Sequence, residues 1–233
     1  MQTSRPISPS GPTERLAWPR CLVKIAPRLR HAATHQYINK MSTHPTILAT
    51  SNVDAGTLAG LAGCVPGLIG DLRSDHAGET GAVAIYLGIL AVARDPGIRR
   101  FAEAHLATER DHLARLGALL PPAQRSVLLP LWRVAGWLTG FLPALFGPRA
   151  VYATIDAVET FVDQHYEEQV HKLPAHGPGG ALKALLMACQ ADEVHHRDEA
   201  RAAGVRAGGR LTQAWQWLVG TGSALAVKAA RRV

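Results

Sequence analysis

Two Glu-x-x-His motifs lie far apart in this chain, and each follows a single glutamate at a similar distance. The motif Glu109-Arg-Asp-His112 comes after Glu79, and the motif Glu193-Val-His-His196 comes after Glu159. Positions i and i+3 of a helix project from the same face, so each motif would aim a carboxylate and an imidazole at one point. Four carboxylates and two imidazoles from four helices would suit a carboxylate-bridged pair of iron or manganese ions.

A third Glu-x-x-His match, Glu168-Gln-Val-His171, does not fit this arrangement. Glu168 lies nine residues after Glu159 on the same predicted helix. Nine steps of about 100° turn a side chain to the opposite side of a helix, so the two carboxylates cannot face one metal pair. We therefore expect Glu168 and His171 to lie on a solvated face.

The single glutamates lie in apolar or small-residue surroundings. Glu79 lies within the segment Ala77–Ala82, which contains two glycines, and Glu159 lies between Val158 and Phe161. A carboxylate buried among such residues needs a paired charge or a metal ion. These surroundings favour a metal site over an arrangement of solvated charges.

Apolar residues recur at helical spacing along the chain, and no convincing strand pattern occurs. Asp95-Pro96-Gly97 separates the first two predicted helices. A single glutamate, a Glu-x-x-His motif and an apolar segment are followed by the same order again, which indicates a duplicated helix pair. The sequence therefore predicts an all-α four-helix bundle with one long crossover at residues 121–147. The predicted helices cover residues 72–93, 96–120, 126–145, 148–172, 181–203 and 211–230.

Residues 127–146 within this insert are long enough to span a bilayer. A central Arg133, together with Pro130 and Pro143, argues against a spanning helix. A helix lying in the headgroup plane fits better, and a helix packed on the bundle core is the alternative. The tryptophans that would anchor this surface are Trp132, Trp137, Trp215 and Trp217.

The charge of the 233-residue chain is unevenly distributed. Seven of its 25 Lys and Arg residues lie in residues 1–40 with one acid, which leaves 18 against 17 Asp and Glu in the rest. The near-neutral remainder lacks the broad basic face of a nucleic-acid binder. Three scattered cysteines form no disulfide framework.

We expect residues 1–40 to be a disordered or non-native extension, with a transit peptide as the alternative. Residues 41–70 would be a lead-in with one short helical turn, and residues 71–233 the bundle domain.

Four further residues could support the site or contact a substrate. A metal-bound histidine usually donates its other N–H to a carboxylate, and Asp75 and Asp192 are placed to accept from His112 or His196. Tyr166 lies seven residues after Glu159 and therefore shares its face. His165 flanks the same face and could contact a substrate.

Several blocks of the sequence resemble those of a known family. The blocks Asp75–Glu79, Glu109–Leu113, Leu129–Trp132, Ala157–Tyr166 and Asp192–His196 are similar to those of the demethoxyubiquinone hydroxylases. The resemblance covers roughly residues 70–230 and implies a ferritin-like, membrane-associated fold with a di-iron site. It implies two Fe²⁺ ions per chain, with Glu109 and Glu193 or else Glu159 in the bridging role. The ligand positions that match the family are Glu79, Glu109, His112, Glu159, Glu193 and His196.

The resemblance also implies an activity. The chain would use O₂ to hydroxylate the ring of 2-polyprenyl-3-methyl-6-methoxy-1,4-benzoquinol in ubiquinone biosynthesis. It would lie on a membrane surface as a peripheral protein, alone, as a homo-oligomer or with other proteins of this pathway. That surface would be the cytoplasmic face of a bacterial cell membrane, or the mitochondrial inner membrane if residues 1–40 are a transit peptide. The alternatives are another ferritin-like di-iron oxidase and a non-catalytic iron-storage bundle.

Overall fold

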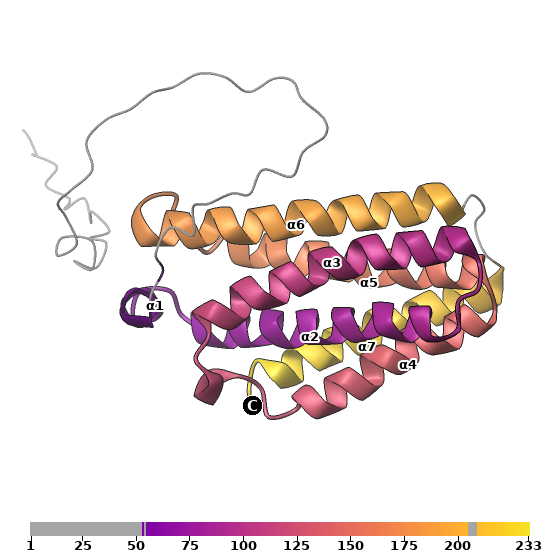
Figure 1. The fold of residues 1–233 in the computed structure, drawn as a ribbon. Helices are drawn as coiled ribbons and strands as arrows, with labels where there is room; N and C mark the ends of the chain where they lie inside the picture. Colours follow the sequence, from indigo (N-terminus) through magenta and orange to yellow (C-terminus); the bar gives the residue numbers. More distant parts are fainter. Residues whose placement is uncertain (1–52, 54, 205–208) are drawn as a thin grey trace, which may run out of the picture. The chain divides into compact units, whose positions relative to one another are not determined.

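The computed structural model describes residues 53, 55–204 and 209–233, and this part of the chain is helical without any strand (Figure 1). The predicted all-α class is therefore confirmed. The elements in chain order are α1 (Ala55–Ala62), α2 (Leu68–Val92), α3 (Pro96–Leu119), the short 3-10 helix η2 (Pro122–Gln124), α4 (Leu129–Leu145), α5 (Pro148–Val170), α6 (Gly177–Gly204) and α7 (Arg210–Ala230).

Four long helices form the bundle: α2, α3, α5 and α6. Helix α2 packs on α3 and α5 packs on α6, so each pair predicted from the sequence is a pair of neighbours in space. In Figure 1, α6 runs along the top of the molecule, whereas α4 and α7 lie along the bottom beside α2. The segment between the two pairs thus crosses the bundle through α4.

Local signals set the helix ends. Asp95 accepts a hydrogen bond from the Ile98 N–H at 2.9 Å and caps α3, which has a proline in its first turn. Gly67 precedes α2 with a φ of 80°, a conformation that favours glycine. Helix α2 begins four residues before the predicted start, and α1 forms two turns within the predicted lead-in. Apolar packing explains the difference, because Leu58 and Leu68 of these segments are buried.

Helices α2 and α4 approach each other through glycines. A Cβ atom at Gly140 would lie 1.9 Å from the Ile85 carbonyl oxygen, and one at Gly136 would lie 2.4 Å from that of Gly81. Neither position can therefore carry a side chain at this helix separation. The apolar insert is in consequence packed tightly on the bundle along this glycine face.

The buried apolar residues form two clusters. One contains Ile85, Ile89 and Phe101, and the other contains Leu72 and Leu186. Along α2 the buried Glu79 lies between the residues that belong to the two clusters. The clusters therefore leave a polar layer between them in the bundle interior.

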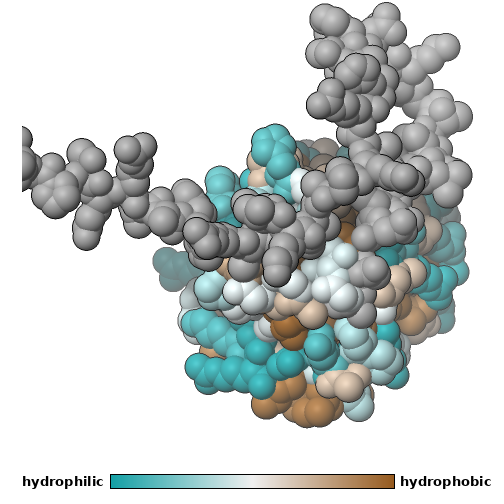
Figure 2. Space-filling view, turned by 90° about the vertical axis from the view of Figure 1, so that its left-hand side faces the viewer, coloured by the Kyte–Doolittle hydropathy of each residue, from teal (hydrophilic) through white to brown (hydrophobic). Residues whose placement is uncertain are grey.

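The outward sides of α4 and α7 carry many exposed apolar side chains. Trp217 is 69% exposed, and Phe146, directly after α4, is 83% exposed. Further exposed apolar residues of these helices are Leu131, Val134, Leu138, Leu142, Leu211 and Leu225. Figure 2 shows apolar side chains at the lower edge of the molecule, where α4 lies in Figure 1. In the described part of the chain, none of the helices combines the length and apolarity needed to cross a bilayer.

Candidate metal centre

The structure brings together the six side chains that the two motifs and the two single glutamates predict. Each of the four bundle helices supplies at least one of them. They fill the polar layer of the interior, and none is more than 3% exposed. They are Glu79 of α2, Glu109 and His112 of α3, Glu159 of α5, and Glu193 and His196 of α6.

The six residues form two overlapping groups, in each of which one ligand atom per residue lies within 4.8 Å of the others. One group joins Glu79 and His112 to a shared pair of glutamates. The other joins Glu159 and His196 to the same pair. The shared glutamates are Glu109 and Glu193. This arrangement offers two neighbouring positions for metal ions with two carboxylates between them.

The imidazoles contact carboxylates from the opposite helix pair. His112 Nδ1 lies 3.0 Å from Glu193 Oε1, and His196 Nδ1 lies 3.1 Å from Glu109 Oε1. His196 Nδ1 is also 3.3 Å from Glu193 Oε2. Each Glu-x-x-His motif therefore does aim its two side chains at one point, as its helical spacing predicts.

Burial dominates the electrostatics of the glutamates. It raises the pKa of Glu109 and Glu159 well above the usual range, and the charge of Glu193 adds to the effect. Burial also raises the pKa of Glu193 to about 7, although a hydrogen bond with His112 opposes it. For Glu79, burial raises the pKa, but the hydrogen bond and charge of His112, together with hydrogen bonds from Glu109 and Tyr166, lower the value overall. So many carboxylates in one dry layer are stable only with protons or cations among them.

Several ligand atoms are left without hydrogen bonds, which tests whether the site fits a metal. Both oxygens of Glu109 and one oxygen each of Glu79 and Glu193 have no hydrogen-bond partner among the described residues. The same holds for His196 Nδ1, whose contact with Glu109 lacks hydrogen-bond geometry. Buried polar atoms of this kind are costly unless something else binds them. The donor set of oxygen and imidazole nitrogen fits iron or manganese.

The two aspartates predicted to support the histidines have different partners. Asp192 Oδ2 lies 3.1 Å from His112 Nε2, on the side of the ring away from the glutamates. Asp75 contacts neither His112 nor His196, so the expectation that it could orient one of them is wrong. Its Oδ1 instead lies 3.0 Å from His165 Nε2 and 2.6 Å from Gln169 Nε2. Asp75 faces α5 because it lies one helical turn before Glu79.

Two tyrosines donate hydrogen bonds to the single glutamates. The Tyr166 hydroxyl donates to Glu79 Oε1 at 2.5 Å, and the Tyr86 hydroxyl donates to Glu159 Oε1 at 3.2 Å. Tyr166 was among the sequence candidates, whereas Tyr86 was missed. The signal was present, because Tyr86 follows Glu79 by the same seven residues that separate Tyr166 from Glu159.

His105 is a second residue that the sequence analysis missed. Its ring stacks on that of His196 at a centroid distance of 3.9 Å, and its Nδ1 lies 3.2 Å from the Tyr86 hydroxyl. Its Nε2 lies 2.9 Å from Glu199 Oε2 at the surface. Burial and the charge of His196 lower the pKa of His105 to about 4. Helical spacing could have found it, because it lies one turn before Glu109.

The third Glu-x-x-His match lies outside the site. Glu168 and His171 are both exposed. His171 contacts Glu167 at 3.8 Å on the surface of the same helix. The helical phase argument therefore predicts their place correctly.

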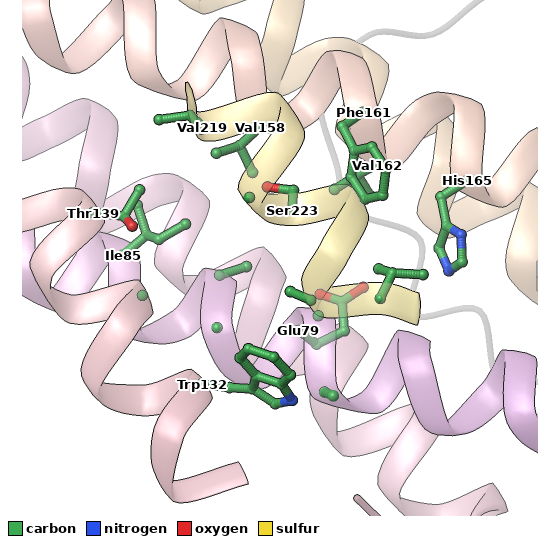
Figure 3. A pocket seen from close by; sticks show the side chains of 18 of the residues that line it. Glu79, Ile85, Trp132, Thr139, Val158, Phe161, Val162, His165, Val219 and Ser223 are labelled. Atoms are coloured by element: carbon green, nitrogen blue, oxygen red, sulfur yellow. The ribbon is translucent and has the colours of Figure 1, made fainter. Parts of the chain in front are cut away.

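A cavity of about 370 Å³ extends from the glutamates to α4 and α7 (Figure 3). Figure 3 shows Glu79, Trp132 and His165 facing this cavity, and Val158 and Val219 line it farther along. Trp215 also lines it and donates a hydrogen bond to Thr154. Two of the four tryptophans expected at the outer surface thus face inward, whereas Trp137 and Trp217 are exposed.

A helical bundle with a buried Glu and His layer at the end of an apolar cavity has the arrangement of the carboxylate-rich bundles that can hold metal ions. Comparison with known proteins defines the family within this class. Residues 68–230 match the family described as ubiquinone biosynthesis protein COQ7. The chain therefore belongs to the COQ7 family, as its resemblance to the demethoxyubiquinone hydroxylases implied.

Similar proteins come from both bacteria and eukaryotes. A 3-demethoxyubiquinol 3-hydroxylase of Rhodospirillum rubrum is 39% identical over 141 residues, which are 58% of this chain and 64% of that protein. A mitochondrial NADPH-dependent 3-demethoxyubiquinone 3-hydroxylase of Dictyostelium discoideum is 36% identical over 54% of this chain and 59% of its own length. The Caenorhabditis elegans protein of that name is 31% identical over 70% of this chain and 88% of its length. The chain thus spans less than two thirds of the first two relatives.

Proposed function

We propose that this protein is a 3-demethoxyubiquinol 3-hydroxylase. It would use O₂ to convert one ring C–H of 2-polyprenyl-3-methyl-6-methoxy-1,4-benzoquinol to C–OH. Two electrons and two protons from a reductant would convert the second oxygen atom to water. The names of the relatives support this activity, and those of the mitochondrial relatives specify NADPH.

One observation carries the proposal. The buried layer of four glutamates and two histidines lies at the inner end of an apolar cavity, in a chain of the COQ7 family. An iron-storage bundle would need the polar layer but has no use for an apolar cavity lined by tryptophan and valine. The cavity therefore favours an enzyme that acts on an apolar substrate.

The six clustered side chains would hold two iron ions. We assign Glu109 and Glu193 as the bridging ligands, because only these two belong to both groups of described residues. Glu79 with His112, and Glu159 with His196, would complete the two positions. When bound, the iron pair supplies the reductive activation of O₂. Asp192 would hold the His112 ring with its metal-binding nitrogen facing inward.

The cavity would place the substrate ring beside the glutamates. Its inner part is bounded by Glu79, Trp132 and His165, so the ring would lie there. Farther out, Val158 and Val219 offer an apolar path for the prenyl tail. These walls also exclude water from the reacting carbon, which strengthens the electrostatic contacts of the site.

We also propose that the protein binds a membrane surface through α4 and α7. These two helices line the cavity, α7 carries the exposed Trp217 and Leu225, and the exposed Phe146 directly follows α4. A substrate with a prenyl tail partitions into lipid, so entry from the bilayer would need no passage through water. Residues 1–40, expected to be an extension or a transit peptide, lie outside the described residues. Relatives with mitochondrial and bacterial names are both known, so the membrane is either organellar or bacterial.

Quinone profiling of cells that lack the gene tests the activity. We expect these cells to accumulate the demethoxy quinone and to lack ubiquinone. The wild-type gene and the Glu168→Ala control should restore ubiquinone, whereas Glu79→Ala and His196→Ala should not. Purified protein with iron, NADPH and the substrate should form the hydroxylated product only under O₂.

Three outcomes would contradict the proposal. Normal ubiquinone in the deletion strain, without a second hydroxylase, would remove the assigned reaction and favour another di-iron oxidase. Iron uptake without O₂-dependent product formation would favour a storage bundle instead. Restoration by His196→Ala would show that the clustered residues do not carry the activity.

A further inference from the structure

Two tyrosines, one in α2 and one in α5, each donate a hydrogen bond to the glutamate of the other helix. Tyr86 lies in α2, seven residues after Glu79, but its hydroxyl donates to Glu159 of α5. Tyr166 lies in α5, seven residues after Glu159, but its hydroxyl donates to Glu79 of α2. Each single glutamate thus accepts a hydrogen bond from the helix that carries the other.

Helical geometry explains this reciprocal pairing. Seven residues make about two turns, so each tyrosine points into the bundle from the same face as the glutamate of its own helix. The phenol is long enough to cross to the opposite helix. Tyr86 is completely buried, and Tyr166 is 1% exposed. Neither hydroxyl is therefore satisfied by bulk water.

We propose that Tyr86 is a positioning residue of the metal centre, which fixes the Glu159 carboxylate for the ion held with His196. Tyr166 would fix Glu79 in the same way for the ion held with His112. The inference rests on the metal centre proposed above and does not depend on the hydroxylation reaction. It concerns groups that contact ligands and does not require them to contact the substrate.

The hydrogen bond would act by selecting one oxygen of the carboxylate. Glu159 Oε1 accepts the phenol proton, which lowers its electron density and occupies one of its lone pairs. The other oxygen is then the stronger ligand. With a metal ion bound, the Glu159 carboxylate would be charged, and a charged carboxylate is a better acceptor than a neutral imidazole. The Tyr86 hydroxyl therefore donates its hydrogen bond to Glu159 and not to His105, which is also 3.2 Å away.

The ring of Tyr86 has a separate packing role that the test must leave intact. It contacts Phe101, which belongs to the same apolar cluster, and the ring of His105. Phenylalanine at this position would keep the ring and remove only the hydroxyl. Tyr152 provides a matched control, because it packs edge-to-face on Phe101 and belongs to neither group of candidate ligands.

The experiment titrates cobalt(II) into metal-free protein and records the visible absorption bands of the bound ion. A His112→Ala background keeps the position of His196, and a His196→Ala background keeps that of His112. With His112→Ala, Tyr86→Phe should weaken cobalt binding by about 10–100-fold and shift the bands. Tyr166→Phe and Tyr152→Phe should change neither quantity there. With His196→Ala, Tyr166→Phe should have the effect and Tyr86→Phe should not.

The thermal unfolding of each metal-free variant separates positioning from packing. Unchanged cobalt affinity and bands in Tyr86→Phe would overturn the inference, and a lower unfolding temperature beside them would assign the hydroxyl to packing alone. Equal effects of Tyr86→Phe at both positions would overturn the pairing of each tyrosine with one ion. If the wild type takes up no cobalt or iron, the metal centre itself is wrong, and this inference fails with it.

Discussion

Glu109 and Glu193 are the carboxylates within reach of both predicted metal positions, whereas Glu79 belongs to one. We therefore expect Glu193→Ala to lose both ions and Glu79→Ala to retain about one. Metal analysis of protein purified without oxygen would measure this. Glu168→Ala is the control and should keep two ions per chain, because Glu168 is exposed. Two ions in Glu193→Ala would contradict the bridging assignment.

The raised pKa values make the metal-free protein sensitive to alkali. Burial raises the pKa of Glu193 from 4.5 to about 7, and it also raises the pKa of Glu109 and of Glu159 well above the usual range. The folded state then binds protons that the unfolded state has already lost, so the free energy of unfolding falls as pH rises. Histidines with a lowered pKa, such as His105, oppose this only below about pH 6.5.

We therefore expect the metal-free protein to lose stability between about pH 6.5 and 8, as the pH rises through the pKa of Glu193. Each group that is still protonated contributes up to about 1.4 kcal/mol per pH unit. Urea unfolding at several pH values would measure the slope. Protein loaded with iron should show a much smaller slope, because the metal holds the carboxylates ionised. A metal-free protein that is equally stable at both ends of this range would contradict the expectation that the buried glutamates are protonated in the folded state.

Single residues also show how far sequence reasoning reaches. The spacing of Glu109 and His112 predicts that they share a face, since helical phase is a local property of the chain. The partner of Asp75 could not be predicted, because it depends on the rotation of α2 relative to α5. The contact of Tyr86 with Glu159 crosses the bundle and is likewise a property of packing.

Helix α4 depends on its glycines to lie against α2. We expect Gly140→Ala to lower the free energy of unfolding by about 1–3 kcal/mol or more, because its Cβ would meet the backbone of Ile85. Denaturant unfolding would measure this. Gly220→Ala in α7 is the control, since nothing lies within 4 Å of its Cβ position. That control should be neutral or stabilising by about 0.5–1 kcal/mol, and equal losses in both variants would contradict the packing argument.

The helices themselves were predictable to within a few residues, because their ends carry strong local signals. Asp95 with Pro96 starts α3 where the sequence indicates. The start of α2 was placed too late, because the polar, glycine-rich residues 41–70 were expected to form a lead-in. Tertiary burial of Leu68 extends the helix there. The glycine face of α4 was not foreseen, since a glycine reveals close approach only when its neighbour is known.

The molecule as a whole should bind liposomes through the apolar side of α4 and α7. Replacing Phe146 and Trp217 together by glutamate should weaken binding by at least about tenfold, because each exposed side chain would otherwise bury its apolar area in lipid. Flotation with anionic liposomes would measure this. Met187→Glu, at an exposed apolar position on α6, is the control. An equal loss of liposome binding in the control would show that the weaker binding of the double variant arises from changed solubility.

The sequence predicts only part of this apolar surface. Sequence reasoning identifies the apolar insert and its tryptophans, since both are local features. It could not tell which tryptophans face outward, because the cavity that receives Trp132 and Trp215 exists only in the packed bundle. The inward pair belongs to the proposed substrate path and the outward pair to the proposed lipid contact.

The exchange of glutamates between the two helix pairs has a consequence for the chain as a single unit. Each group of four ligands takes three side chains from one half of the molecule and borrows Glu109 or Glu193 from the other. Neither half of the chain therefore contains all four residues of either group. Two copies of one hairpin related by a twofold axis would build the same centre by lending one residue each. Separating the two halves after cleavage of the chain would therefore abolish both ion positions together. Reassociation of the halves would restore both positions at once.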